Sequence, residues 1–247
     1  MQIIYNVKER YLYRSLNFYK AKEKNMKKIR MSRELAYILG LFIMPFAVAF
    51  TVRADLGMSM VAAPAYIISQ KIGIISYGTT EYLFQAIFLI LMCVIIRKAR
   101  FSYLTSFATA VVYGYILDFA VYVTQFIPAN SLFVRIPLFV LGMVMTSLAV
   151  AFFFNTYLAP CAYDFFVRVV GHEKKLDMRK WKLGFDFSML ILSVALSLIL
   201  FHKFVAISYG TFIMAVFNGN IIAFFSNTMQ KHIEFFDRFP LAKYFEN

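Results

Sequence analysis

The sequence contains little cysteine, little histidine and few charged residues. Its two cysteines, Cys93 and Cys161, are too few for a disulfide framework. The three histidines are scattered along the chain, and no cluster of Cys and His has metal-ligand spacing. Only 16% of the residues are charged, too few to cover the surface of a soluble domain of this length. We therefore expect no metal ion and no cofactor, and a soluble globular fold is excluded.

Motifs of the common enzyme classes are also absent. The sequence has no G-x-S-x-G, no H-E-x-x-H, no P-loop and no phosphate-binding glycine run. An intramembrane protease would need paired aspartates or a Ser/His pair within membrane spans, and Asp118 has no such mate. The sequence thus predicts that the protein is not an enzyme.

What the chain does contain is apolar and aromatic residues. The hydrophobic fraction is 61%, with 29 Phe and 16 Tyr, and the mean hydropathy is +0.67. This composition predicts an all-α polytopic membrane protein, which we expect in a bacterial cytoplasmic membrane. Because a spanning helix needs about 20 apolar residues, the expected spans are 35–53, 79–97, 103–127, 133–157, 183–202 and 205–228. Two shorter apolar stretches, 57–73 and 160–171, predict re-entrant or half-length helices.

A repeat of 102 residues joins the two halves of the chain. The first copy contains Leu39-Gly40, Ala47-Val48-Ala49-Phe50 and Leu56, and the second contains Leu141-Gly142, Ala149-Val150-Ala151-Phe152 and Leu158. A short stretch follows the matched leucine in both copies. Transporters are the commonest membrane proteins of this plan, with a site between the copies near the midplane of the bilayer.

The direction of the second copy depends on the number of spans. Six spans give inverted copies and place 22 of the 26 Lys and Arg residues on the side of the termini, whereas eight spans give parallel copies and place 21 there. Positive residues concentrate on the cytoplasmic side, so both alternatives put the N- and C-termini in the cytoplasm. The shortness of 57–73 and 160–171 favours six spans and an inverted repeat.

Charge is concentrated outside the apolar stretches. The net charge is +13, and we interpret it as contact with anionic lipid at the cytoplasmic face, with no nucleic-acid partner. Residues 1–34 are predicted to form a basic, amphipathic cytosolic arm. Residues 35–127 and 128–228 form the two membrane repeats, and residues 229–247 form a cytosolic interfacial tail. Since six helices make few internal contacts, a homodimer is plausible.

Ionisable residues in membrane spans are costly and usually face a cavity or a partner. Asp118 lies deep in the third long stretch, four residues after Gly114 and on the same helical face, either at a functional cavity or bonded to a neighbouring helix. Arg53 and Asp55 follow the first span and lead into the first short helix, which Ser59 is placed to cap. We predict that Asp118, Asp55 and Ser59 bind substrate, with Arg53 in gating or orientation.

The second copy has different side chains at the matching positions. Asn155 and Tyr157 stand where the first copy has Arg53 and Asp55, and Asp164 and Arg168 lie four residues apart on one face of the second short helix. We assign these second-copy residues to substrate binding as well. Glu81 and Asp186 lie near the starts of equivalent helices, where either the helix dipole or a gating role explains an acidic residue. A site between the copies therefore has different side chains on its two sides, which suits one asymmetric solute.

Three runs of the sequence resemble the YczE/YitT-like group of bacterial integral membrane proteins. They are LGLFIMPFAVAFTVRADLGMS from Leu39, SYGT from Ser76 and YGYILD from Tyr113. Motifs of that group correspond here to Leu56-Gly57-Met58-Ser59, to Gly114 with Asp118, and to the stretch from Pro160 to Asp164. Met60 and Ala159 stand where the group has proline and glycine. The resemblance covers about 35–228 and implies a membrane transport protein, without indicating a substrate.

Two functions follow from these observations. The first is a secondary transporter or exporter of a small polar solute, bound between the repeats and moved by rocking one repeat against the other. The alternative is a substrate-binding membrane subunit or scaffold that needs a partner for activity.

Overall fold

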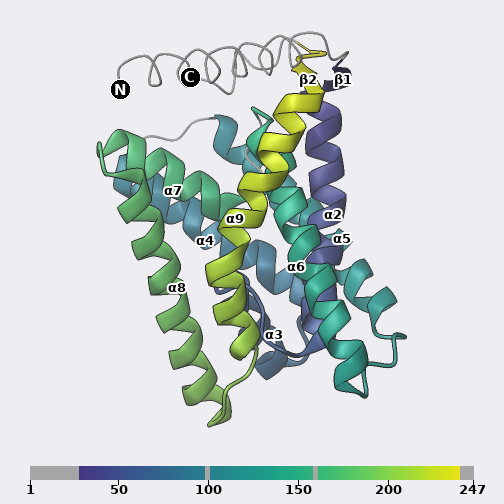
Figure 1. Ribbon diagram of the computed structural model, residues 1–247. Helices are drawn as coiled ribbons and strands as arrows, with labels where there is room; N and C mark the ends of the chain where they lie inside the picture. The colour runs from purple at the N-terminus through teal and green to yellow at the C-terminus, as the bar shows by residue number, and fades with distance from the viewer. Residues whose placement is uncertain (1–27, 98–100, 158–160, 240–247) are drawn as a thin grey trace, which may run out of the picture.

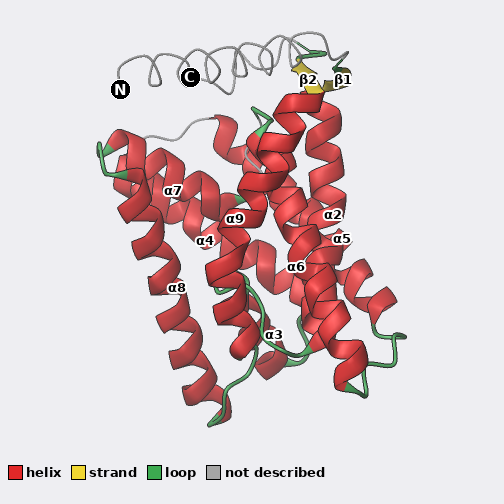
Figure 2. Cartoon of the chain, viewed as in Figure 1, coloured by secondary structure: helices red, strands yellow, loops and turns green. Residues whose placement is uncertain are grey.

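A computed structural model describes residues 28–97, 101–157 and 161–239 (Figure 1). In this part of the chain there are eight helices and two short strands, so the protein is almost entirely helical (Figure 2). Six helices are long and apolar enough to cross a membrane. They are α2 (Arg33–Ala54), α4 (Tyr77–Ile96), α5 (Phe101–Thr124), α6 (Leu132–Phe154), α8 (Met178–Phe201) and α9 (Tyr209–His232). The predicted polytopic helical membrane fold, with six long spans, is confirmed.

Polar residues at the helix starts explain where several spans begin. Ser32 and Ser76 precede α2 and α4, and their hydroxyls accept hydrogen bonds from Leu35 N and Thr79 N at 3.2 and 3.1 Å. Asp177 does the same for α8, accepting from Arg179 N at 3.0 Å. These side chains satisfy amide groups that have no partner inside the helix.

The two short stretches form the short helices α3 (Ala63–Ile72) and α7 (Ala162–Glu173). The helices lie at opposite ends of the bundle: α3 near the bottom of Figure 1, and α7 near the top, at the end that carries the strands. Because the long helices alternate in direction, the unit α2–α3–α4–α5 is repeated upside down by α6–α7–α8–α9. This arrangement is the predicted inverted repeat.

The repeated motif lies at the contact between α2 and α6, the first long helices of the two copies. A Cβ added to Gly40 would come within 2.7 Å of the Phe153 ring, and one added to Gly142 within 2.8 Å of the Ala47 carbonyl oxygen. Ala47 and its counterpart Ala149 are both completely buried. The small residues at matching positions of the two copies thus allow α2 and α6 to pack closely about the axis between the repeats.

The copies differ in how their last two long helices meet. In the first copy, α4 packs along α5, whereas α8 and α9 of the second copy barely touch. The cross-contacts between copies are preserved, because α7 packs on α4 and α3 packs on α8. The fold is therefore closed between α4 and α5 and open between α8 and α9.

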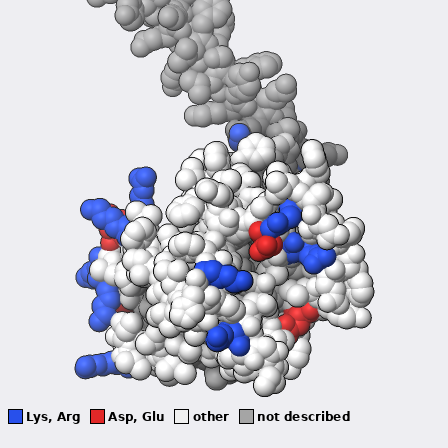
Figure 3. Space-filling model, turned by 90° about the horizontal axis from the view of Figure 1, so that it is seen from below, with Lys and Arg blue, Asp and Glu red and all other residues white. Residues whose placement is uncertain are grey.

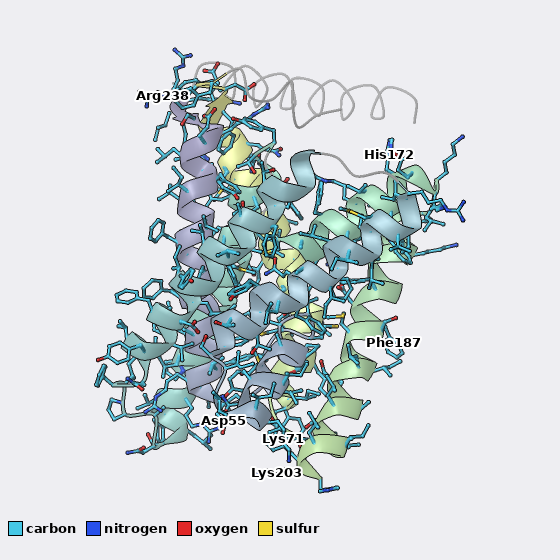
Figure 4. All side chains as sticks on the ribbon, turned by 180° about the vertical axis from the view of Figure 1, so that it is seen from behind. Asp55, Lys71, His172, Phe187, Lys203 and Arg238 are labelled. Carbon is cyan, nitrogen blue, oxygen red and sulfur yellow. The ribbon has the colours of Figure 1, made fainter. Side chains whose placement is uncertain are left out.

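The two ends of the bundle differ in structure. Strands β1 (Ile29–Ser32) and β2 (Ile233–Phe236) pair in parallel at one end, which we call the terminal end; this pairing was not predicted. Figure 4 shows His172 and Arg238 at this end and Asp55, Lys71 and Lys203 at the other, the α3 end. Seen from below, the molecule shows mostly uncharged side chains with scattered Lys and Arg (Figure 3). Most of the predicted basic arm, residues 1–27, lies outside the described residues.

Candidate functional site

A cavity of about 330 Å³ lies between the two repeats. It is bordered by α2 and α4 from the first copy and by α6, α8 and α9 from the second. Ala62 and Cys161, which directly precede α3 and α7, also line it. The N-terminal ends of both short helices therefore meet at one cavity, although they enter it from opposite ends of the bundle.

Unsatisfied polar atoms mark this cavity. Among the described residues, four buried side-chain atoms make no well-aligned hydrogen bond: Glu81 Oε2, Thr146 Oγ1, Tyr163 OH and Asp186 Oδ1, of which Asp186 Oδ1 is paired with Lys182 Nζ at 3.1 Å. All four residues line the cavity, and they come from four different helices. Since buried polar groups are nearly always well hydrogen-bonded, a concentration of poorly satisfied groups at one place indicates a site for a polar ligand or for water.

Glu81 is the most deeply buried acidic residue of the site, with 2% of its surface exposed. Its Oε1 accepts a hydrogen bond from Gln85 Nε2 at 3.2 Å. Gln85, fully buried one turn further along α4, also accepts from Ala162 N at 3.0 Å and so fixes the start of α7. The Tyr163 hydroxyl lies beside Glu81 and interacts with its carboxylate as a second neutral donor, through a poorly aligned hydrogen bond. Glu81 is thus held by neutral donors, and none of the described residues forms an ion pair with it.

A charged triad borders the cavity near the terminal end. Lys182 Nζ lies 2.9 Å from Asp164 Oδ1 and 3.1 Å from Asp186 Oδ1, so that one ammonium group bridges α7 and α8. The Lys182 and Asp164 side chains are 40% and 45% exposed. Because an exposed ion pair contributes little to stability, the triad is better explained by its place at the mouth of the cavity.

The remaining wall is apolar and flexible. It includes four methionines, which come from α2, from the segment before α3 and from α9: Met44, Met58, Met60 and Met214. Unbranched thioether side chains adapt to ligands of different shape. The cavity therefore combines an adaptable apolar wall with a small number of charged groups.

The structure brings four of the predicted site residues to this cavity and leaves the others elsewhere. Ser59, Glu81, Asp164 and Asp186 line it. Ser59 does not cap α3, which starts four residues later; its carbonyl oxygen instead accepts from Ala62 N and Ala63 N.

Asp118 lies away from the cavity, at the joint between α5 and α4. Its Oδ2 accepts from Ser76 Oγ and its Oδ1 from Gly78 N, both at 2.6 Å. It borders a separate, more open hollow at the α3 end. Of the two alternatives for this residue, the geometry matches the bond to a neighbouring helix, because the carboxylate caps the first turn of α4.

Arg53 and Asp55 join helix ends at the α3 end. Arg53 donates from Nε to the Ile127 carbonyl oxygen at 2.7 Å, and Arg135 Nη2 lies 2.8 Å from Asp55 Oδ2. Arg135 also donates to the Ala54 carbonyl oxygen at 2.6 Å. These contacts connect α2, α6 and the loop after α5, and the Asp55 side chain remains 83% exposed.

Asn155 and Tyr157 lie at the terminal end. Asn155 Nδ2 donates to the Ala151 carbonyl oxygen at 2.8 Å, and the Tyr157 hydroxyl donates to Glu34 Oε1 at 2.9 Å. Burial, together with this hydrogen bond, raises the pKa of Tyr157 to about 12, so the phenol remains a donor at neutral pH. Arg168, the predicted partner of Asp164, instead lies over the Phe165 ring at 5.7 Å.

Sequence reasoning missed three important residues of the site: Thr146, Tyr163 and Lys182. Lys182 carries the one usable signal, since it lies four residues before Asp186 on the same helical face. The neutral polar residues carry none that separates them from ordinary intrahelical hydrogen bonding. Among the described residues, no group of three or more His, Cys, Asp or Glu could hold a metal ion.

Comparison with known proteins gives the family but not the substrate. Residues 31–227 match DUF6198, a family of unknown function. This range contains the first five spans completely and α9 except for its C-terminal end. The chain belongs to this family. Over 197 residues it is 25% identical to the uncharacterized protein YyaS of Bacillus subtilis (strain 168), covering 79% of this chain and 93% of that protein. No solved structure matches significantly. The DUF6198 match thus spans both repeats and the whole cavity.

Proposed function

We propose that this DUF6198 protein is a secondary transporter of a small polar solute, which binds in the cavity between the two repeats. The observation that carries the proposal is that the four buried polar atoms of the described residues without a well-aligned hydrogen bond all belong to residues that line that one cavity. An inverted repeat with a central site is the architecture used for alternating access in many transporters.

The two ends of the cavity support a gated path. At the α3 end, the segment after α2 is bonded to the start of α9, with Gly210 N donating to the Leu56 carbonyl oxygen at 2.8 Å and Met58 N to that of Ala206 at 3.1 Å. Gly57 makes this contact possible: its φ is +106°, and a Cβ there would lie 2.7 Å from Thr211 N. At the terminal end, the partly exposed Lys182 and Asp164 lead from solvent into the cavity. In the proposed cycle, these contacts support a state that is open toward the terminal end and closed at the α3 end.

The inverted repeat suggests the structure of the other state, which is open at the α3 end. If each copy adopts the conformation of the other, α8 closes on α9 while α4 separates from α5. This exchange would open the α3 end without changing the α2–α6 contact on the axis. The difference between the copies that the structure shows is thus the difference that alternating access requires.

We further propose that the terminal end faces the cytoplasm of a bacterial cell and that the protein lies in the cytoplasmic membrane. The Lys and Arg count supports this orientation, because 22 of 26 belong to segments on that side. We expect anionic lipid around these segments.

Reconstitution into liposomes tests transport directly. Purified protein alone is expected to catalyse flux of a solute that it binds, and Glu81→Gln is expected to reduce that flux without loss of folded protein. Glu234→Gln, an exposed acid in β2, is the matched control. A solute that binds in the cavity but is not moved by the protein alone would refute the proposal.

That result would favour the second candidate, a substrate-binding subunit that needs an energising partner. The sparse packing of α9 supports this candidate, since only 11% of its most apolar window is buried within the chain. The exposed sides of α8 and α9 would then bind the partner, or a second copy in the homodimer expected from the sequence. Membership of the YczE/YitT-like group and the absence of enzymatic activity stay predictions.

A further inference from the structure

We infer that the ligand of the cavity is a small organic ammonium ion with an apolar body, and that its ammonium group binds the Glu81 carboxylate in competition with a proton. The inference builds on the cavity of the proposed function and specifies its ligand class. It does not depend on whether the protein completes a transport cycle.

The balance of charge around the cavity excludes an anionic ligand. Among the described residues that border it are three carboxyl groups, those of Glu81, Asp164 and Asp186, and one ammonium group, that of Lys182. Lys182 is already shared between the two aspartates, at 2.9 and 3.1 Å. An anion would therefore meet carboxylates that nothing else neutralises, whereas a cation would find acceptors on both sides of the cavity.

Glu81 is the group that lacks a counter-charge. A buried carboxyl group without a cationic partner is stable in two forms, protonated or paired with a cation from outside the protein. The structure provides Glu81 with neutral donors only, Gln85 and the nearby Tyr163 hydroxyl, and Oε2 makes no well-aligned hydrogen bond and is less than a tenth exposed. An ammonium ion that reaches Oε2 must therefore displace the proton, which leaves through the terminal mouth of the cavity.

Among the described residues, no other group that faces Glu81 exchanges a proton for a bound cation. The side chains close enough to affect it, or to share the cavity with it, are Tyr77, Tyr113, Cys161, Tyr163, Asp164, Lys182 and Asp186. The tyrosines and the cysteine are neutral donors near neutral pH. Lys182 is held by the two aspartates, and α2 contributes only Met44, Val48 and Thr51. Glu81 is therefore the acid whose protonation a bound cation changes.

The apolar wall defines the rest of the ligand. Met44, Met58 and Met214 line the same cavity as the carboxyl groups, and their sulfur and methylene groups favour an aromatic or alkyl body. About 330 Å³ admits an aromatic ring with a short chain. The combination of one acidic pocket with a methionine wall selects an amine that carries such a body.

Three probes of the same shape test the inference: 2-phenylethylammonium, 2-phenylethanol and phenylacetate. Binding to the protein in lipid nanodiscs is read from the fluorescence of Trp181, the only tryptophan of the chain, which precedes Lys182 and donates to the Val167 carbonyl oxygen. Calorimetry provides an independent measurement. The ammonium ion is expected to bind at least about tenfold more tightly than the alcohol, because hydrogen bonds to a charged partner are stronger. Phenylacetate is expected not to bind.

The pH dependence tests the competition with a proton. Between about pH 5 and 8, where an alkylammonium ion stays charged, affinity for 2-phenylethylammonium is expected to rise with pH. Glu81→Gln is expected to remove both the rise and the preference for the ammonium ion, while the control Glu234→Gln keeps both. Equal affinities for ammonium and alcohol, or a pH dependence that survives in Glu81→Gln, would overturn the inference.

The result is decisive even if Glu81→Gln does not fold, because the three probes and the pH series are measured on the unaltered protein. Binding of the ammonium ion without flux in liposomes would overturn transport and keep the ligand class. Flux of a neutral or anionic solute, without binding of the ammonium ion, would overturn the ligand class and keep transport.

Discussion

Gly78 of α4 and Gly114 of α5 lie back to back, so close that a Cβ on Gly78 would come 1.9 Å from the Gly114 carbonyl oxygen. The obstructing atom is backbone, which cannot move aside as a side chain can. The contact brings the Gly78 amide onto Asp118 and closes the first copy at the point where the second copy is open.

Gly78→Ala is therefore expected to destabilise the protein by about 1–3 kcal/mol or more, because overpacking would force α4 away from α5. Thermal unfolding in detergent measures the change. Gly184→Ala is the matched control, since nothing lies within 4 Å of a Cβ on that α8 glycine. The control is expected to be neutral or stabilising by about 0.5–1 kcal/mol. Equal melting temperatures for the two variants would contradict the packing described.

Asp118→Ala is expected to lower stability by about 1–3 kcal/mol, because Ser76 and the Gly78 amide would both lose their acceptor. Flux per folded molecule is expected to persist, since Asp118 lies outside the cavity. Asp55→Ala, whose side chain is 83% exposed, serves as the comparison and should change stability by less than about 1 kcal/mol. A loss of flux in Asp118→Ala with an unchanged melting temperature would instead support a coupling role.

Lys182→Met is expected to raise the affinity for 2-phenylethylammonium severalfold, because the variant removes the one ammonium group that competes for Asp164 and Asp186. Stability is expected to fall by about 1–3 kcal/mol, because the buried Asp186 Oδ1 loses its partner. Lys203→Met, which removes the same charge at the α3 end, is the control. Weaker binding in Lys182→Met would show that Lys182 holds the ligand rather than opposing it.

Labelling of introduced cysteines tests the orientation. With Cys93 and Cys161 replaced by serine, Lys203→Cys is expected to react with a membrane-impermeant maleimide in intact cells. Lys174→Cys should react only after permeabilisation, because it follows α7 at the terminal end. Both positions are exposed. Reaction of both from the same side would rule out the six-span arrangement.

The architecture could be predicted because its causes are local. The length of an apolar run decides whether a helix spans the bilayer, and the distribution of Lys and Arg decides which loops stay together on one side. The repeat was visible because the α2–α6 contact requires small residues at the same positions of both copies, as Gly40 and Gly142 show. The pairing of β1 with β2 was not visible, since it joins segments about 200 residues apart.

The site was only partly predictable, as Asp118 and Glu81 illustrate. Asp118 lies deeper in its apolar stretch and was the leading candidate for a binding residue. Glu81 lies near the start of a helix, where the helix dipole by itself favours an acidic residue. The helical period shows which residues share a face, but it does not show what that face meets. Glu81 faces the cavity because α4 packs against α7 of the other copy, and Asp118 meets the start of α4 because Gly78 and Gly114 touch.

The sequence by itself determined the six spans, the two half-length helices and the duplication, because hydrophobic length and charge act on each segment separately. Only the tertiary structure decided which polar groups converge, because that depends on contacts between copies about 100 residues apart. The packing of α3 and α7 across the repeats, and the separation of α8 from α9, turn scattered polar residues into one cavity. Its charged groups are Glu81 and the triad of Asp164, Lys182 and Asp186.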